Sequence, residues 1–384
     1  MSTARILNKL IGFDTVSRNP NIALMDFVRE VLAGVGVEAV LIPNEDGSKA
    51  NLLATIGPAD RGGVMLSGHT DVVPVEGQNW TRPAFELTEE NGRYYGRGTT
   101  DMKGFVACAL AAGLKAADRP LKSPLHLAFS YDEEIGCQGV RSMIDLLKAA
   151  PVKPAMCIVG EPTSMQVATG HKGKVALKAR CVGREGHSAL APLAMNALHL
   201  GCDLVGALRD VQSGLQKAGI HDGDYDVPYT TVHAARMQGG VALNIVPNLC
   251  EVDFEIRNVA QDDPEAVLAD IRARADAIVA RVAGHAPEAA IAFAVNFSYP
   301  GLDTPGTAEV VKFVQSLTGA NGICKVAFGT EGGLFSQEVG VPTVVCGPGS
   351  MMQGHRPDEY VDVAQIERCD AMLEVLLQRL EAGL

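Results

Sequence analysis

The sequence predicts an α/β protein in which one domain is interrupted by a second, inserted domain. Short apolar runs alternate with segments of helical period through about the first 160 residues. After residue 173 the order of elements changes, and the first pattern returns after residue 299. The chain of 384 residues is long enough for two or three domains. We expect the first domain to comprise residues 1–172 and 299–384, and the inserted domain residues 173–298.

The first domain is expected to begin with an amphipathic helix at the N-terminus. Strands are then predicted over 64–66, 125–131 and 156–159, and helices over 101–115 and 139–149. Near the end of the chain, a strand over 341–346 and a helix over 363–380 complete the pattern. Alternating strands and helices of this kind form a sheet with helices on both faces.

The inserted segment has a different order. Strands are expected over 174–182, 230–236, 251–258 and 289–295, and helices over 192–217 and 264–283. In chain order these elements read βαββαβ, which is the order of a ferredoxin-like unit.

Composition excludes several classes of protein. The chain has 45 acidic and 33 basic residues, a net charge of −12, and no run of Lys or Arg that would bind nucleic acid or an anionic membrane. Its longest apolar stretch, 105–114, is far shorter than the ~20 residues of a membrane span. The N-terminus lacks the apolar core of a signal peptide, and the nine cysteines include no C-x-x-C. We therefore predict a cytoplasmic protein with reduced core cysteines and neither nucleic-acid nor membrane partners.

Potential metal ligands follow the expected strands. His69 and Asp71, in GHTDVV, are two residues apart on an extended segment, so one side chain can bind a metal while the other orients it. Asp101, in GRGTTDMKG, lies where a Gly-rich turn enters a helix, and its carboxylate could bridge two cations. Taken singly, both aspartates also fit a capping role.

Two adjacent glutamates, Glu133 and Glu134, follow the strand over 125–131, so one can bind a metal while the other acts as a general base. Glu161, in GEPT, and His355, in a Gly-rich loop, again follow strands. Together the chain offers the two histidines and three carboxylates that two bridged, zinc-like ions require: His69, Asp101, Glu134, Glu161 and His355. No G-x-S-x-G, P-loop or H-E-x-x-H motif competes, and GRGTTD lacks the third glycine of a dinucleotide-binding loop.

In chain order, GHTDVVPV, GRGTTDMKG, the Asp-Glu-Glu run, GEPT and GHRPDEY resemble the motifs of the M20 family of metallopeptidases and deacylases. The resemblance covers nearly the whole chain. It implies a zinc-peptidase-like catalytic domain with an inserted lid and dimerisation domain, two divalent ions (Zn²⁺, with Co²⁺ as the alternative), and a cis peptide between Asp101 and Met102. The implied roles are His69 and Glu161 on one ion, Glu134 and His355 on the other, Asp101 bridging, Glu133 as base and Asp71 behind His69.

The resemblance also implies roles in the inserted domain. His187, in GREGHSA, would reach the active site of the partner subunit in a homodimer and polarise the scissile carbonyl, while Asn244 and Arg257 would hold the carboxylate of the substrate. Without the family resemblance, His187 would be interpreted as a turn residue and Arg257 as a charged surface residue.

Within the family, FGTEGGLF and PTVVCGPGSMMQGHRPDEY most resemble enzymes that release acetate from N2-acetyl-L-ornithine, giving L-ornithine for arginine biosynthesis. Glu331 is then expected to meet the side-chain ammonium of the substrate; an exposed loop glutamate is the alternative reading. Other substrates stay open: succinyl-diaminopimelate, another N-acyl amino acid or a dipeptide. So do two functions outside the class, a non-catalytic metal- or ligand-binding module and a nicotinamide-dependent oxidoreductase.

Overall fold

A computed structural model describes residues 1–384, and the chain divides into two compact units. The first unit comprises residues 1–171 and 302–384, and the second comprises residues 172–301. The expected domain boundaries, 172/173 and 298/299, fall next to these divisions.

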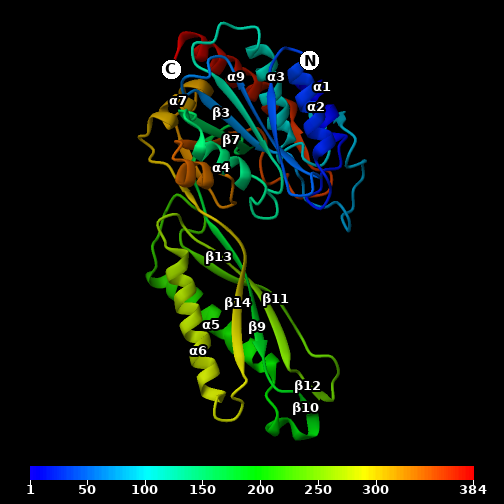
Figure 1. Ribbon diagram of the computed structural model, residues 1–384, viewed down its shortest axis with the longest axis vertical. Coiled ribbons are helices and arrows are strands. Elements are labelled where there is room, and N and C mark those ends of the chain that lie inside the picture. The colour runs from blue at the N-terminus through cyan, green and yellow to red at the C-terminus, as the bar shows by residue number, and fades with distance from the viewer. The chain divides into compact units, whose positions relative to one another are not determined.

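A nine-stranded mixed sheet forms the centre of the first unit (Figure 1). Its order is β1-β2-β6-β3-β7-β17-β8-β15, with β16 paired to β8. The four central strands β6, β3, β7 and β17 run parallel, so their carboxyl ends meet at one edge, where α/β proteins bind ligands. The bounds are β1 (Ala39–Pro43), β2 (Ala50–Ile56), β3 (Val64–His69), β6 (Leu125–Ser130), β7 (Met156–Pro162), β8 (Val167–His171), β15 (Leu302–Asp303), β16 (Ile323–Val326) and β17 (Thr343–Gly347).

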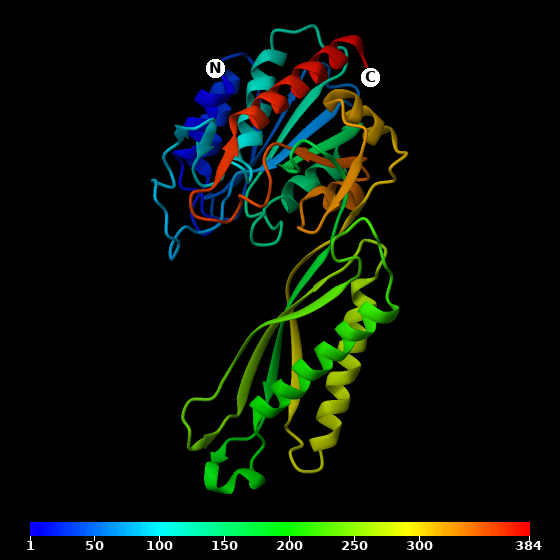
Figure 2. The same ribbon diagram turned by 180° about the vertical axis from the view of Figure 1, so that it is seen from behind.

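Helices cover both faces of this sheet, as expected. On one face α3 packs against β3, β6 and β7, and α1 and α9 pack on α3, whereas α4 contacts β2 and η2. Figure 1 shows α4 in front of the sheet, and Figure 2, from behind, shows α9 in front. The bounds are α1 (Thr3–Ile11), α2 (Ile22–Ala33), α3 (Lys103–Ala116), α4 (Arg141–Ala149), α7 (Glu309–Thr318), α8 (Gly332–Leu334), the π-helical turn η2 (Phe335–Val339) and α9 (Val363–Ala382).

Helix α3 is buried almost all round, because it presents small residues to its neighbours. Two strand glycines let it approach the sheet closely. A Cβ added to Gly160 of β7 would lie 1.9 Å from the ring of Phe105, and one added to Gly68 of β3 would lie 2.9 Å from the terminal methyl of Met102. The start of α3 is therefore fixed against both strands.

A small three-stranded sheet, β18-β5-β4, links two segments that are distant in sequence. Its strands are β4 (Thr88–Glu90), β5 (Arg93–Tyr95) and β18 (Tyr360–Asp362). The turn that carries Asp101 follows β5, and the loop that carries His355 precedes β18. The pairing of β5 with β18 brings these two segments together.

The second unit has a four-stranded antiparallel sheet, β11-β13-β9-β14, with α5 and α6 along one face (Figure 2). Its main elements follow in the order βαββαβ. A two-stranded β10-β12 pair and a 3-10 turn, η1, lie between them in the sequence. The bounds are β9 (Lys174–Val182), β10 (Gly186–His187), η1 (Ser188–Leu193), α5 (Ala197–Ala218), β11 (Thr231–Gly239), β12 (Ile245–Val246), β13 (Leu249–Arg257), α6 (Pro264–Val282) and β14 (Ala290–Tyr299).

Two expectations need correction. The helix predicted over 192–217 begins at Ala197, because Asn196 caps it by accepting a hydrogen bond from the Leu198 N–H, and Pro192 lies in the separate turn η1. The cysteines are all unpaired, but they are not all in the core, since Cys202 is exposed and Cys324 partly so. No helix of the structure combines the length and apolarity that crossing a membrane requires.

Candidate metal centre

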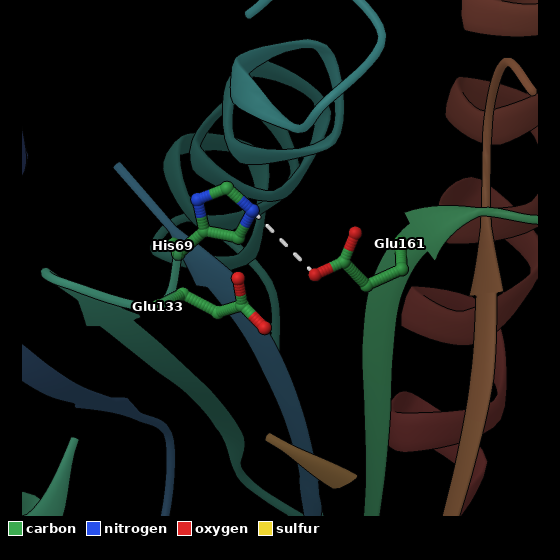
Figure 3. Close-up of side chains that lie close together, drawn as sticks. All are labelled: His69, Glu133 and Glu161. Carbon is green, nitrogen blue, oxygen red and sulfur yellow. Dashed lines mark ion pairs between the residues drawn. The ribbon is translucent and has the colours of Figure 1, made fainter. Parts of the chain in front are cut away.

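The carboxyl ends of the parallel strands gather the expected ligands of the first unit. His69 ends β3, Glu161 lies near the end of β7, and Glu134 follows β6. Asp101 lies just before α3, in a turn that includes the expected cis peptide to Met102. Figure 3 shows His69 and Glu161, on two strands, and Glu133, in the segment after β6, converging on one another.

Asp101 lies between two histidine-carboxylate pairs. Its Oδ1 is 3.0 Å from His69 Nε2, and its Oδ2 is 3.1 Å from His355 Nε2. His69 Nε2 is also 3.5 Å from Glu161 Oε1, and His355 Nε2 is 3.1 Å from Glu134 Oε2. All five expected ligands are thus together, in the expected pairs, with one oxygen of Asp101 directed to each pair.

These residues fit two divalent cations. Ligand atoms ~2.1 Å from a tetrahedral ion lie about 3.4 Å from one another, close to the separations of 3.0 to 3.5 Å found here. Imidazole and carboxylate are also the donors that such ions prefer. Histidines are the only ion-pair partners of Asp101, Glu134 and Glu161, so no Lys or Arg balances their charge.

The pKa shifts of the clustered side chains also indicate a site for cations. Burial raises the pKa values of Glu133 and Glu161 well above their usual range and that of Glu134 to about 7. Hydrogen bonds to Asp101 and Glu134 raise the pKa of His355 to about 10. Burial opposes the charged form of His69, but the neighbouring carboxylates outweigh it and raise the pKa of that imidazole too. Groups that retain protons in this way lie in an excess of buried negative charge, which bound cations would neutralise.

Asp71 has a wider role than the one expected for it. His69 Nδ1 lies 2.9 Å from the backbone carbonyl oxygen of Asp71 and 3.5 Å from its carboxylate, so the carbonyl is the nearer partner. The carboxylate instead accepts hydrogen bonds from Ser17 Oγ at 2.7 Å and from the backbone N–H groups of Glu133 and Glu134 at 3.1 and 3.3 Å. Asp71 therefore fixes the segment after β6 as well as His69.

Glu133 lies beside the ligands without an ion pair of its own. Its carboxylate is grouped with the His69 imidazole and the Glu161 carboxylate, with one ligand atom of each within 4.8 Å of the others (Figure 3). Its only side-chain hydrogen bond comes from Cys137 Sγ at 3.4 Å. This carboxylate is therefore available to act as a general base.

Glu331 is buried, so the reading of it as an exposed loop glutamate is wrong. It precedes α8, and only 1% of its surface is exposed. Ser67 Oγ donates to its Oε2 at 3.3 Å, whereas its Oε1 makes no well-aligned hydrogen bond. Burial raises the pKa of this carboxyl to about 7, against the opposing effect of the nearby Ser130 hydroxyl.

The remaining predicted residues lie in the second unit. His187 in β10 and Asn244 before β12 are close, since the Ser188 N–H donates to the Asn244 carbonyl at 3.0 Å. Arg257 ends β13, where it donates to Glu255 at 3.0 Å and to the Tyr299 hydroxyl at 3.2 Å. Strand β13 separates Arg257 from the β10-β12 end by about 26 Å at ~3.3 Å per residue. Within one chain, Asn244 and Arg257 therefore cannot hold one carboxylate together.

Two residues near the site were missed by the sequence reasoning. Ser17 holds Asp71, and Glu359 accepts hydrogen bonds from the turn that carries Asp101. Glu359 lies in GHRPDEY, one of the informative motifs, but only His355 was singled out there. Ser17 carries no comparable signal.

The profile of peptidase family M20/M25/M40 matches residues 65–379 of the chain. The chain belongs to this family. An acetylornithine deacetylase of Pasteurella multocida is 33% identical over 94% of the chain and 92% of its own length. One from Salmonella typhimurium is 35% identical over 87% of the chain and 84% of its own length.

Solved structures of the M20 family share the fold. A metallo-carboxypeptidase from Sulfolobus solfataricus covers 100% of both chains with a TM-score of 0.81 and 20% identity. A dinuclear metal-binding M20 peptidase from Bacillus subtilis covers 99% of this chain and 98% of its own, with a TM-score of 0.67 and 16% identity. The expected family and α/β fold class are confirmed, and the protein is a metal-dependent hydrolase of the M20 family.

Proposed function

We propose that the protein is a two-metal amidohydrolase that converts N2-acetyl-L-ornithine to acetate and L-ornithine, a step of arginine biosynthesis in the cytoplasm. The observation that carries the proposed chemistry is the position of Asp101, with one oxygen toward His69 and the other toward His355. The substrate is supported by the acetylornithine deacetylases that are 33 and 35% identical to this chain.

In the proposed mechanism, Glu133 is the general base. Two divalent cations, Zn²⁺ or Co²⁺, held by the five ligands would polarise the amide carbonyl and lower the pKa of the attacking water. Glu133 takes a proton from that water as its oxygen bonds to the carbonyl carbon. It then gives the proton to the leaving nitrogen as the C–N bond breaks. Asp71 holds the Glu133 backbone in place during both transfers.

We assign the side-chain ammonium of ornithine to Glu331. Its buried Oε1 makes no well-aligned hydrogen bond, and an unpaired buried carboxylate oxygen is costly unless a cation or donor reaches it. An ammonium supplies both a positive charge and hydrogen-bond donors, whereas an apolar side chain supplies neither. The charge of Glu331 would thereby distinguish acetylornithine from neutral N-acetyl amino acids.

The proposed active unit is a homodimer in which His187 comes from the second copy. His187 lies beyond the end of β9 at Val182, whereas the chain enters the second unit beside the start of β9 at Lys174. Several large apolar side chains are exposed near His187, as is typical of an interface: Leu190, Leu193, Val241, Leu243 and Ile245. A second copy that covers these side chains would receive His187 and Asn244 at its own metal centre.

A substrate panel tests the proposal. The zinc- and cobalt-loaded protein is assayed with N2-acetylornithine, N2-acetylcitrulline, N-acetylmethionine, N-succinyl-diaminopimelate and a dipeptide, and kcat/KM is measured from the free amine released. We expect N2-acetylornithine to be the best substrate, with activity that a chelator abolishes and two ions restore. A higher kcat/KM with a succinyl substrate or a dipeptide would contradict the proposed substrate but not the proposed two-metal hydrolysis. Chelator-resistant hydrolysis, or no hydrolysis at all, would overturn the two-metal amidohydrolase itself.

A further inference from the structure

Arg97 and Glu359 form a buried ion pair next to the ligand cluster. Each has only 1% of its side-chain surface exposed, and Arg97 Nη1 lies 2.6 Å from Glu359 Oε2. Neither residue belongs to the five ligands or to the assigned substrate contacts. Because removing two charges from water is costly, a buried pair of this kind is weak evidence for stability and calls for another role.

The second oxygen of Glu359 organises the turn that carries Asp101. Glu359 Oε1 accepts hydrogen bonds from the backbone N–H groups of Gly98, Thr100 and Asp101 at 3.1, 3.0 and 3.1 Å. The Glu359 carbonyl also accepts from the Gly96 N–H at 2.9 Å. Four backbone N–H groups on the way into Asp101 are thus held by this one residue.

Arg97 extends the same network to the loop that carries His355. Its Nη2 donates to Gln78 Oε1 at 2.5 Å, and Gln78 Nε2 donates to the His355 carbonyl at 2.9 Å. Arg97 Nη1 also reaches the Arg356 carbonyl at 3.4 Å. The ion pair therefore joins the two backbone segments that present Asp101 and His355.

We infer that Glu359, held by Arg97, is a positioning residue that sets the separation of Asp101 and His355 and thereby the affinity for the ion that they share with Glu134. The inference rests on the proposed dinuclear site. A carboxylate suits this role because one oxygen can accept three N–H groups while the other pairs with the guanidinium. A glutamine has one carbonyl oxygen for both tasks, and its NH₂ group repels either set of donors.

Zinc titration against a chelating indicator tests the inference by resolving the two ion affinities of each variant. We expect Glu359→Gln to weaken the ion between Asp101 and His355 by about 10- to 100-fold, the usual effect of losing a hydrogen-bond partner of a ligand. Gln78→Ala, at a partly exposed residue, should weaken the same ion and leave the His69 ion unchanged. With Mn²⁺ in both sites, electron paramagnetic resonance should show altered coupling between the ions in Glu359→Gln, a change that a general loss of stability would not cause.

Glu374→Gln is the matched control, because Glu374 pairs with Arg119 at 2.6 Å in the same unit but contacts none of the ligands. Both of its ion affinities should equal those of the wild type. If Glu359→Gln binds both ions with wild-type affinity, the inference is wrong although the dinuclear site stands. If Glu359→Gln does not fold, unchanged affinities for both ions in Gln78→Ala would contradict the inference instead. Fewer than two ions in the wild-type protein would overturn the proposed dinuclear site together with the inference.

Discussion

The two units hold their candidate functional residues in different ways. In the first, the side chains contact one another, as His69, Asp101 and His355 do through 3.0 and 3.1 Å separations. In the second, His187 is exposed, and about 26 Å of β13 separates its end of the sheet from Arg257. The first unit therefore brings all five candidate ligands together, whereas in our proposal the residues of the second unit act beside a second subunit.

The charged residues of the second-unit sheet have local partners that the carboxylates of Asp101, Glu134 and Glu161 lack. Its sheet carries cross-strand ion pairs, such as Lys174 with Glu255 at 2.9 Å and Arg236 with Asp253 at 2.9 Å. Such pairs stabilise a partly solvated sheet modestly. The acids around Asp101 have no comparable Lys or Arg partners, which is why they indicate ions.

The largest effect should come from Glu133→Gln, which tests whether the chemistry resides in the first unit. Removing the base should lower kcat for N2-acetylornithine by about 10²- to 10⁴-fold. The expected ion content is unchanged, because Glu133 is not among the five ligands. Metal analysis alongside the assay separates the two effects, and a variant with near-normal kcat would remove Glu133 from the mechanism.

The next largest effect should come from His187→Ala, which tests what the second unit supplies. The loss of one donor to the developing negative charge should lower kcat by about 10²- to 10³-fold. Mixing this variant with Glu133→Gln and allowing subunits to exchange should restore about a quarter of wild-type activity, since half the dimers then hold one intact site. No recovery after demonstrated exchange would show that His187 does not act across subunits.

A smaller effect, confined to one substrate, is expected for Glu331→Gln. Loss of its charge should lower kcat/KM for N2-acetylornithine by about ten- to a hundredfold, because the ammonium would lose its partner. N-acetylmethionine, which has no side-chain charge, should be hydrolysed at the wild-type rate. Equal losses on both substrates would instead assign Glu331 to the support of the metal centre.

The smallest effect is on stability, at His126 in β6 of the first unit. Its Nε2 is buried without a partner, and burial lowers the pKa of the imidazole to about 4. Because the unfolded chain keeps a pKa near about 6.5, it binds the proton first, and the folded state loses stability as the pH falls from that value toward 4.

The variant His126→Gln should remove this contribution. Between pH 7 and 4.5 the Tm of the wild type should fall further than the Tm of the variant, and calorimetry should show a difference between the two falls on the order of 2 °C. Parallel Tm curves for the two proteins would show that His126 does not titrate in this window.

The parts of the fold that the sequence predicted are those with strong local patterns. The buried strands β3, β6, β7 and β17 and the apolar helix α3 were expected, as was the gathering of their following residues at one edge. The edge strand β1 was missed, as were the inner strand β8 and the helices α2 and α7.

The details of the site that were missed depend on partners distant in sequence. Asp71 accepts from Ser17, which is 54 residues away, and Glu359 accepts from Asp101, which is 258 residues away. Such pairs exist only after the sheet has formed. The expectation of an exposed Glu331 failed for a local reason. The two glycines that follow it suggest an exposed loop, although the residue is buried.

Gly68 and Gly160 each stand one place before a candidate ligand, His69 and Glu161, and both face α3. Since side chains alternate along a strand, the bare positions point toward the helix while the ligands point away from it. The absence of a side chain at both glycines lets the start of α3 pack directly on the strand backbone. The distance between Asp101, which precedes α3, and the strand ligands therefore depends on these two glycines. A carbon added at Gly160 would overlap the Phe105 ring and push the start of α3 away from the sheet, which would widen the spacing between Asp101 and the strand ligands without replacing any candidate ligand.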